Sequence, residues 1–166
     1  MIITFKPYNI IIQIYYKYSK NNKKKIEREE EIEYIKQACK ITDDCFAHIV
    51  NYIRPGMTEK QIAEEIEEYY KKRTDGLSFD TIVASGENTS KPHAIPTDRK
   101  IQTNDIITID MGCKVNGYCS DMTRTVVIGK ANDKQKEIYN VVLEAQLAGL
   151  AAVKAGKTGK EVDKAA

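Results

Sequence analysis

Two aspartates stand inside an apolar segment, where carboxylates are costly to bury and unfavourable in strands. The segment is TIDMGCKVNGYCSDMTRTVVIG, residues 108–129, and the aspartates are Asp110 and Asp121. Carboxylate oxygens bind divalent cations well, and two like charges held close together raise each other's pKa unless a cation compensates. The residue types indicate a metal site whose geometry depends on the surrounding hairpin.

The dipeptide Asn116-Gly117 predicts a two-residue β-turn between two strands. A type I′ turn places Gly112 opposite Asp121 and puts both aspartates on one face. They are then diagonal neighbours, about 7–8 Å apart at the backbone. We expect the small Gly112 to leave room for an ion. A three-residue loop would put the two carboxylates on opposite faces instead.

The two faces of this hairpin differ in character. The face opposite the aspartates is apolar and is expected to be core, with Ile107, Ile109, Met111, Met122, Val126 and Ile128. The aspartate face is polar and carries three hydroxyl side chains that can support metal ligands, Thr108, Thr123 and Thr125. The alternative interpretation is a pair of solvent-exposed carboxylates, and the spacing alone does not decide between the two.

Two helices are predicted before the hairpin. The first starts at Glu29 and ends at the Arg-Pro-Gly of residues 54–56. Thr58 begins the second helix and forms a capping box with Gln61. The apolar positions of the first helix recur at helical spacing: Ile32, Ile35, Cys39, Thr42, Phe46, Ile49 and Ile53.

His93 is a candidate catalytic residue because of the loop that holds it. A strand is predicted over residues 77–85, and residues 86–100 form a loop rich in Gly, Ser and Pro. Functional residues are often found on such loops. The other histidine, His48, lies within the first helix and is interpreted as a helix-surface residue.

Residues 52–66 align with residues 152–166 at an offset of one hundred positions. Each copy contains the end of a long helix, a glycine, a threonine cap and the start of a second helix. The second copy even repeats the capping box, with Thr158 and Glu161. This pattern predicts an internal duplication, and a matching set of strands is then missing from the C-terminal end. The alternative is two unrelated helix–turn–helix pairs.

Composition describes about one globular domain. The chain has 166 residues, of which 42% are hydrophobic and 30% charged. A net charge of +2 argues for no nucleic-acid partner and no membrane partner. The four cysteines show no zinc spacing and no local pair that can bridge. Four thiols without a signal peptide predict a cytoplasmic location.

Residues 1–25 differ from the remainder of the chain. They contain six lysines and no acidic residue. Their apolar run is too short and too interrupted to cross a bilayer. We expect an edge strand followed by a solvated lysine linker, or an arm that has lost its own domain.

Three segments carry a resemblance to a known family: residues 79–101, 105–129 and 135–163. They resemble the Xaa-Pro dipeptidases (prolidases) and Xaa-Pro aminopeptidases, which are dinuclear metallopeptidases of the pita-bread fold. The resemblance covers residues 26–166 and leaves residues 1–25 outside. It implies an α+β pita-bread fold with pseudo-twofold symmetry, truncated here to about its first half.

The resemblance also implies a site and a reaction. The family has five metal ligands, in the order two Asp, one His and two Glu. Asp110 would chelate one divalent ion (Mn, Co or Zn) and Asp121 would bridge two. His93 matches an active-site histidine that contacts the substrate near the scissile bond. The implied reaction is metal-assisted hydrolysis of peptides with proline at the second position, with a Glu as general base.

The remaining ligands of the family follow the two aspartates in sequence. Here forty-five residues follow Asp121, and they contain no histidine. We therefore expect this chain alone to bind metal weakly and to be inactive, and a homodimer would be the obvious source of further ligands. Two alternatives stay open: a methionine aminopeptidase, which shares the fold and the paired Asp, and a non-catalytic binding or assembly module. The segments PHAIPTDR and SDMTRT are closer to the proline-specific branch.

Overall fold

The computed structural model describes residues 2–4 and 29–166, which belong to two compact units, Met1–Lys130 and Ala131–Ala166. The first unit contains the helices α1 (Glu29–Tyr52) and α2 (Glu59–Lys71) and the short 3₁₀ helix η1 (Gly86–Ser90). Its strands are β1 (Ile2–Thr4), β2 (Gly76–Leu77), β3 (Ile82–Ser85), β4 (Ile106–Met111), β5 (Cys113–Val115), β6 (Tyr118–Cys119) and β7 (Met122–Ile128). The second unit contains α3 (Asp133–Ala152) and α4 (Gly159–Asp163).

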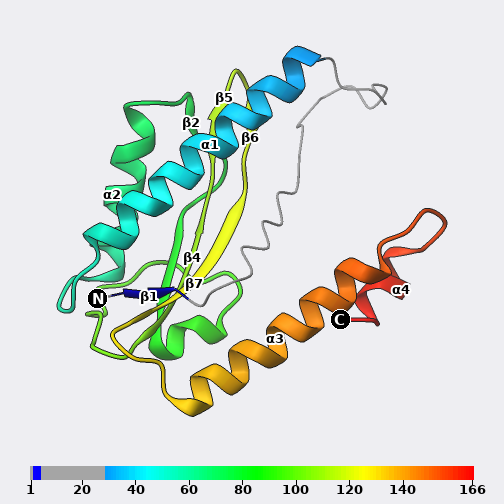
Figure 1. Cartoon of the computed structure of the whole chain (residues 1–166). Coiled ribbons are helices and arrows are strands. Elements are labelled where there is room, and N and C mark those ends of the chain that lie inside the picture. Colours follow the sequence, from blue (N-terminus) through cyan, green and yellow to red (C-terminus); the bar gives the residue numbers. More distant parts are fainter. Residues whose placement is uncertain (1, 5–28) are drawn as a thin grey trace. The chain divides into compact units, whose positions relative to one another are not determined.

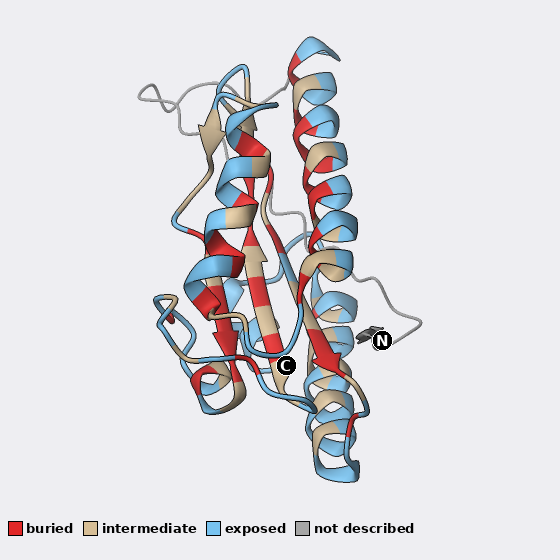
Figure 2. Ribbon diagram, turned by 90° about the vertical axis from the view of Figure 1, so that its left-hand side faces the viewer, coloured by how far each residue is buried: buried red, intermediate tan, exposed pale blue. Residues whose placement is uncertain are grey.

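α1, described from Glu29 onward, buries one face along its length, as Figure 2 shows. Three glutamates in its first turn, Glu29 to Glu31, favour the positive end of the helix dipole. Ile32 is 41% exposed, so the prediction that it belongs to the buried face is wrong. The buried stripe passes instead through Glu31, which lies about 100° away around the helix. The Glu31 carboxylate accepts a hydrogen bond from the Tyr118 hydroxyl at 2.8 Å.

α2 starts with the predicted capping box. The Gln61 backbone N–H donates to Thr58 Oγ1 at 3.1 Å, and the Thr58 N–H donates to Gln61 Oε1 at 2.9 Å. Gly56, in the turn between α1 and α2, has a φ of +93°, which favours glycine. The helix buries an apolar face formed by Ile62, Ala63, Ile66 and Tyr70.

One long antiparallel hairpin contributes to both sheets of the first unit. The larger sheet has the strand order β1-β7-β4-β3 and the smaller one β2-β5-β6 (Figure 1). β4 and β5 form one arm of the hairpin, and β6 and β7 form the other. The register is the same in both sheets, with Met111 opposite Met122 and Lys114 opposite Cys119. α1 packs on β5 and β6, and α2 packs on β2 and β3.

Two predicted strands are interrupted in the structure. Residues 77–85 form β2 and β3 with a break at 78–81, and residues 118–129 form β6 and β7 with a break at 120–121. Serine hydroxyls take over backbone partners at both breaks. Ser78 Oγ donates to the Cys113 carbonyl at 2.9 Å, and the Cys113 N–H donates to Ser120 Oγ at 3.0 Å. The hairpin therefore bends between its two halves.

The core lies on the predicted face of the hairpin. All six predicted core residues of β4 and β7 are buried. They belong to one apolar cluster with the buried faces of α1 and α2, including Ile49, Ile62 and Tyr70. Alternation of side chains along the strands then leaves the opposite face of the same hairpin for the aspartates.

The start of the chain forms a short edge strand. β1 pairs antiparallel with β7, with Ile2 opposite Ile128 and Thr4 opposite Val126. An edge strand at the head is therefore confirmed for residues 2–4. The predicted lysine linker falls on residues that lie outside the described part of the chain.

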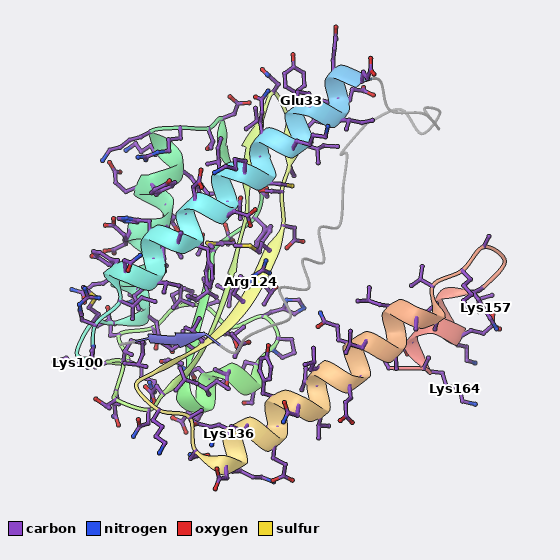
Figure 3. The ribbon with its side chains drawn as sticks, in the orientation of Figure 1. Glu33, Lys100, Arg124, Lys136, Lys157 and Lys164 are labelled. Atoms are coloured by element: carbon purple, nitrogen blue, oxygen red, sulfur yellow. The ribbon has the colours of Figure 1, made fainter. Side chains whose placement is uncertain are left out.

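The second unit repeats the local geometry of the α1–α2 connection. Gly156 has a φ of +86°, close to the +93° of Gly56. Thr158 and Glu161 form the predicted second capping box, with the Glu161 N–H donating to Thr158 Oγ1 at 3.3 Å. Matching caps and turns at equivalent positions support the predicted duplication. Lys136, Lys157 and Lys164 project outward from this unit in Figure 3.

α3 exposes most of its apolar side chains. It buries only Gly149, and in Figure 2 its ribbon is largely pale blue. The exposed apolar residues of this unit are Ile138, Val141, Val142, Leu147, Leu150 and Val153. Among the described residues no helix has the length and apolarity needed to cross a membrane.

Candidate active site

The hairpin closes with a two-residue turn at Asn116 and Gly117. Val115 pairs with Tyr118, and the φ angles of the two turn residues are +49° and +79°. Positive φ at both central positions is characteristic of a type I′ turn, which asparagine and glycine tolerate. The predicted turn and its register are confirmed.

Asp110 and Asp121 lie on the same face of this hairpin. Asp110 pairs with Thr123, and Asp121 precedes Thr123 by two residues, so the alternation of side chains gives both aspartates the same side. Both are half-buried, and both line an open cavity of about 930 Å³. His93 lines the same cavity. The structure therefore brings together the three residues that the sequence singled out.

Gly112 is required by a close backbone approach. A Cβ atom at this position would lie 2.1 Å from the Ser120 carbonyl oxygen and 3.1 Å from the Phe79 ring. The expectation that Gly112 leaves room for an ion is wrong, because the space is filled by the opposite strand. The missing side chain instead lets the two arms of the hairpin bend together directly beside Asp121.

A buried polar network lies behind this bend. The Thr42 hydroxyl of α1 is 2.7 Å from Ser120 Oγ, and the Tyr70 hydroxyl donates to Thr42 Oγ1 at 3.3 Å. Cys113 Sγ is 3.5 Å from Thr42 Oγ1. Buried hydroxyls that satisfy one another hold a single arrangement of the surrounding backbone. The network thus fixes Ser120, the residue immediately before Asp121, against α1.

The electrostatics of the aspartate pair favour a cation. Burial, with a further contribution from the Asp110 carboxylate, raises the pKa of Asp121 above its ordinary value. Both effects disfavour a second negative charge on this face, and a bound cation would relieve them. The Thr123 hydroxyl donates to Asp110 Oδ1 at 2.9 Å, so one of the predicted supporting hydroxyls does contact a carboxylate.

His93 lies on the loop between η1 and β4 and is exposed. The loop folds back on the first unit through its neighbour Ala94, which is buried. His48 lies elsewhere, on the surface of α1, where its Nε2 is 2.6 Å from Glu65 Oε1 of α2. The interpretation of His48 as a helix-surface residue is therefore confirmed.

The described residues include a pair of candidate metal ligands. Two carboxylates on one face suit a hard divalent cation. Within residues 2–4 and 29–166, however, no group of three or more His, Cys, Asp or Glu side chains is placed to hold a metal ion. A pair of aspartates is a partial ligand set, and further ligands would have to come from elsewhere.

Several cavity residues were not found by sequence reasoning. They come from one face of α2 and from the break between β2 and β3: Lys60, Glu64, Glu67, Phe79, Asp80 and Thr81. Thr81 Oγ1 is buried and has no hydrogen-bond partner among the described residues. The spacing of Lys60, Glu64 and Glu67 places them on one side of a helix, but the sequence does not say what that side faces.

Comparison with known proteins places this geometry in a family. Residues 33–166 match the model of metallopeptidase family M24. The chain is 47% identical over 139 residues to an uncharacterized peptidase, YqhT, of Bacillus subtilis, covering 83% of this chain and 39% of that protein. It is 42% identical over 141 residues to the Xaa-Pro dipeptidase of Pyrococcus furiosus, covering 83% of this chain and 40% of that protein.

Solved structures agree with these matches. The structure of the X-Pro aminopeptidase of Thermotoga maritima superposes with a TM-score of 0.79 at 45% identity, over 84% of this chain and 40% of that one. The prolidase of Pyrococcus furiosus gives a TM-score of 0.77 at 41% identity, over 84% and 42%. The chain thus spans about 40% of the length of these relatives. The predicted α+β pita-bread fold is confirmed over this partial catalytic domain, and the chain belongs to metallopeptidase family M24.

Proposed function

We propose that this chain carries part of the active site of a metal-dependent peptidase that hydrolyses Xaa-Pro bonds. The observation that carries the proposal is the common cavity of Asp110, Asp121 and His93 in a member of family M24. The relatives named as Xaa-Pro dipeptidase and X-Pro aminopeptidase support a peptide substrate with proline at the second position. One of these relatives is named as a dipeptidase and the other as an aminopeptidase, so the proposal covers both kinds of Xaa-Pro peptidase.

Each candidate site residue has its own proposed role. Enzymes of family M24 use dinuclear metal centres. Asp110 and Asp121 would hold the ions, and carboxylate ligands suit manganese, with cobalt and zinc as the other candidates. When bound, such ions lower the pKa of a water molecule and polarise the scissile carbonyl. The Thr123 hydroxyl orients the Asp110 carboxylate through its 2.9 Å hydrogen bond.

His93 would act on the substrate rather than on the metal. Its imidazole borders the cavity that the two aspartates line. A positioned donor there stabilises the negative charge that develops on the carbonyl oxygen during peptide hydrolysis. The loop position leaves the ring exposed and accessible to a substrate.

Activity of the isolated chain is a separate question. Among the described residues two carboxylates lack the third partner that a stable metal site needs. We propose that the isolated chain is inactive and binds Mn²⁺ only weakly. A homodimer is the alternative source of ligands, and metal-dependent activity of the isolated chain would reveal it.

The decisive experiment supplies the missing ligands. This chain is joined to the part of the Thermotoga maritima X-Pro aminopeptidase that follows the matched segment, and cleavage of Ala-Pro and Met-Ala peptides is measured with added Mn²⁺. We expect metal-dependent cleavage of the Ala-Pro peptide, reduced about 100-fold or more by Asp121→Asn. The same substitution should change nothing in the isolated chain.

A matched carboxylate serves as the control. Asp44→Asn removes a charge from an exposed aspartate of α1 that pairs with Lys40, and neither residue lines the cavity. This variant should keep full activity in the hybrid. Cleavage that survives Asp121→Asn would refute the proposed metal role, and a preference for Met-Ala would favour the methionine aminopeptidase alternative.

We also propose a reducing compartment, such as the cytoplasm. All four cysteines are free thiols. Disulfides are rare in such compartments, and unpaired thiols are compatible with them.

A further inference from the structure

Glu59 is a charged side chain that the proposed reaction does not use. It is the first residue of α2 and is 0% exposed. A buried carboxylate is stable only when hydrogen bonds replace its lost hydration. Those bonds come from three residues, Ser85, Asn88 and Thr97, none of which belongs to α2.

Each carboxylate oxygen faces one side of the His93 loop. Oε1 accepts from the Ser85 N–H at 2.7 Å and from Ser85 Oγ at 2.6 Å. Oε2 accepts from the Thr97 N–H at 3.0 Å and from Thr97 Oγ1 at 2.6 Å. Asn88 Nδ2 donates to both oxygens, at 3.1 and 3.2 Å. The carboxylate therefore joins residues on both sides of His93.

The ionised form of Glu59 is the one these contacts select. Burial by itself would raise the pKa of Glu59, but hydrogen bonds from Ser85, Thr97 and Asn88 outweigh it and hold the pKa below its ordinary value. Only a carboxylate accepts from all of these donors at once. The Glu59 carboxylate is therefore held in its ionised form by the donors that surround it.

The two ends of the loop depend on Glu59 to different degrees. On the C-terminal side, backbone bonds also hold the chain to α2, from the Lys60 N–H to the Thr97 carbonyl and from the Glu59 N–H to the Arg99 carbonyl, both at 3.2 Å. On the N-terminal side, Asn88 of η1 reaches α2 through the Glu59 carboxylate. Asn88 also accepts from Lys91 Nζ at 2.8 Å, next to the start of the His93 segment. Loss of the carboxylate should therefore release η1 first.

We infer that Glu59 is a positioning residue that holds the loop of His93 at the wall of the metal cavity, by tying η1 and Thr97 to the start of α2. The inference rests on the proposed role of His93 for its catalytic meaning. The ordering of the loop by Glu59 stands on the contacts alone. Glu59 itself does not line the cavity that Asp110, Asp121 and His93 line.

The chain offers a clean spectroscopic test because it has two histidines. Their imidazole Cε1–H signals are followed by NMR in the whole chain. His93 reports the loop. His48 reports the packing of α1 on α2, since it bonds Glu65 and stacks on Tyr69.

Glu59→Gln keeps the shape of the side chain but turns one acceptor into a donor. We expect the His93 signal to shift and sharpen, and amide exchange over residues 88–96 to accelerate about tenfold. The His48 signal and amide exchange in β4 and β7 should stay as in the unsubstituted chain. Glu68→Gln, an exposed residue of the same helix paired with Lys72, is the matched control and should change neither histidine signal.

A second variant keeps the inference testable if Glu59→Gln does not fold. Asn88→Ala removes only the η1 contact and should reproduce the His93 change while His48 keeps its signal. An unchanged His93 signal and unchanged loop exchange in either folded variant would overturn the inference. The loop could loosen as expected while substitution of His93 leaves cleavage by the hybrid unchanged. That result would overturn the proposed role of His93 and leave the inference about Glu59 standing.

Discussion

Gly112 and Glu59 each help to position the backbone around the candidate site, although neither residue lines the cavity. Gly112 lets the Ser120 carbonyl approach the hairpin arm that carries Asp110, because no Cβ stands in the way. The buried Glu59 carboxylate is hydrogen-bonded by Ser85 and Thr97 in place of water. Both act on the backbone beside a candidate site residue, so substitution should first change stability or local order.

Gly112→Ala should destabilise the chain. The new methyl group would meet a backbone oxygen at 2.1 Å, and backbone cannot move aside as a side chain can. We expect a loss of about 1–3 kcal/mol in the free energy of unfolding, measured by urea denaturation. Gly159→Ala, with open space around its Cβ position, is the control and should change stability little. Equal stability of both variants would show that the hairpin bend can relax.

Glu59 should make stability depend on pH in the acidic range. Its folded-state pKa is lowered from the ordinary glutamate value of 4.5, so its stabilisation is complete above that value. As the pH falls below about 4.5, the unfolded chain binds a proton more readily than the folded chain, and the stabilisation is lost through the folded-state pKa. The difference in unfolding free energy between the unsubstituted chain and Glu59→Gln, measured at pH 7, 5, 4 and 3, should therefore shrink toward low pH. A difference that is constant with pH would contradict this assignment.

At the scale of elements, α1 and the hairpin are joined by a polar contact inside an apolar interface. Thr42 is the residue of α1 that reaches Ser120, and the Tyr70 hydroxyl of α2 reaches Thr42. Three elements therefore share one buried hydroxyl. Burial also raises the pKa of the neighbouring Cys45 thiol to about 12, so this thiol stays neutral and contributes no charge.

Thr42→Val should separate the hydroxyl from the shape of the side chain. Valine fills the same volume but leaves the Ser120 and Tyr70 hydroxyls without this partner, and we expect a loss of about 1–3 kcal/mol in unfolding free energy. Thr42→Ser keeps the hydroxyl and should cost about 1 kcal/mol for one buried methyl group. Thermal or urea unfolding checks both. A valine variant as stable as the unsubstituted chain would mean that the hydroxyl network adds nothing.

At the scale of the whole molecule, the exposed apolar side chains of α3 are the feature most open to association. Val141 and Val142 are 61% and 62% exposed, and four further large apolar residues of the second unit are also exposed. Contiguous exposed apolar surface favours contact with another protein surface. The duplicated pattern makes α3 the counterpart of α1, which does bury its apolar face.

The purified chain should therefore self-associate, and charge on α3 should oppose it. We expect Val142→Lys to weaken association about tenfold or more, because a buried valine contributes about 1.5–3 kcal/mol. Asn140→Lys adds the same charge at an exposed polar position and is the control. Sedimentation over a range of concentrations measures both. Identical association of the two variants would place the contact elsewhere.

Local patterns in the sequence determined most of the element boundaries. The capping boxes at Thr58 and Thr158 and the Asn116-Gly117 turn follow from contacts within a few residues. The two-residue turn fixes the hairpin register. This register places Asp110 and Asp121 on one face, because side chains alternate strictly along strands. The family resemblance added the expected roles of these residues and of His93.

Only the tertiary structure decided what depends on contacts between distant segments. The breaks in the predicted strands, the close approach at Gly112 and the exposure of Ile32 all depend on partners far away in the sequence. The same holds for Glu59, whose bonding partners lie 26 to 38 residues along the chain. Helical and strand periodicity tell which side chains share a face, but the packing of one element on another decides what that face meets.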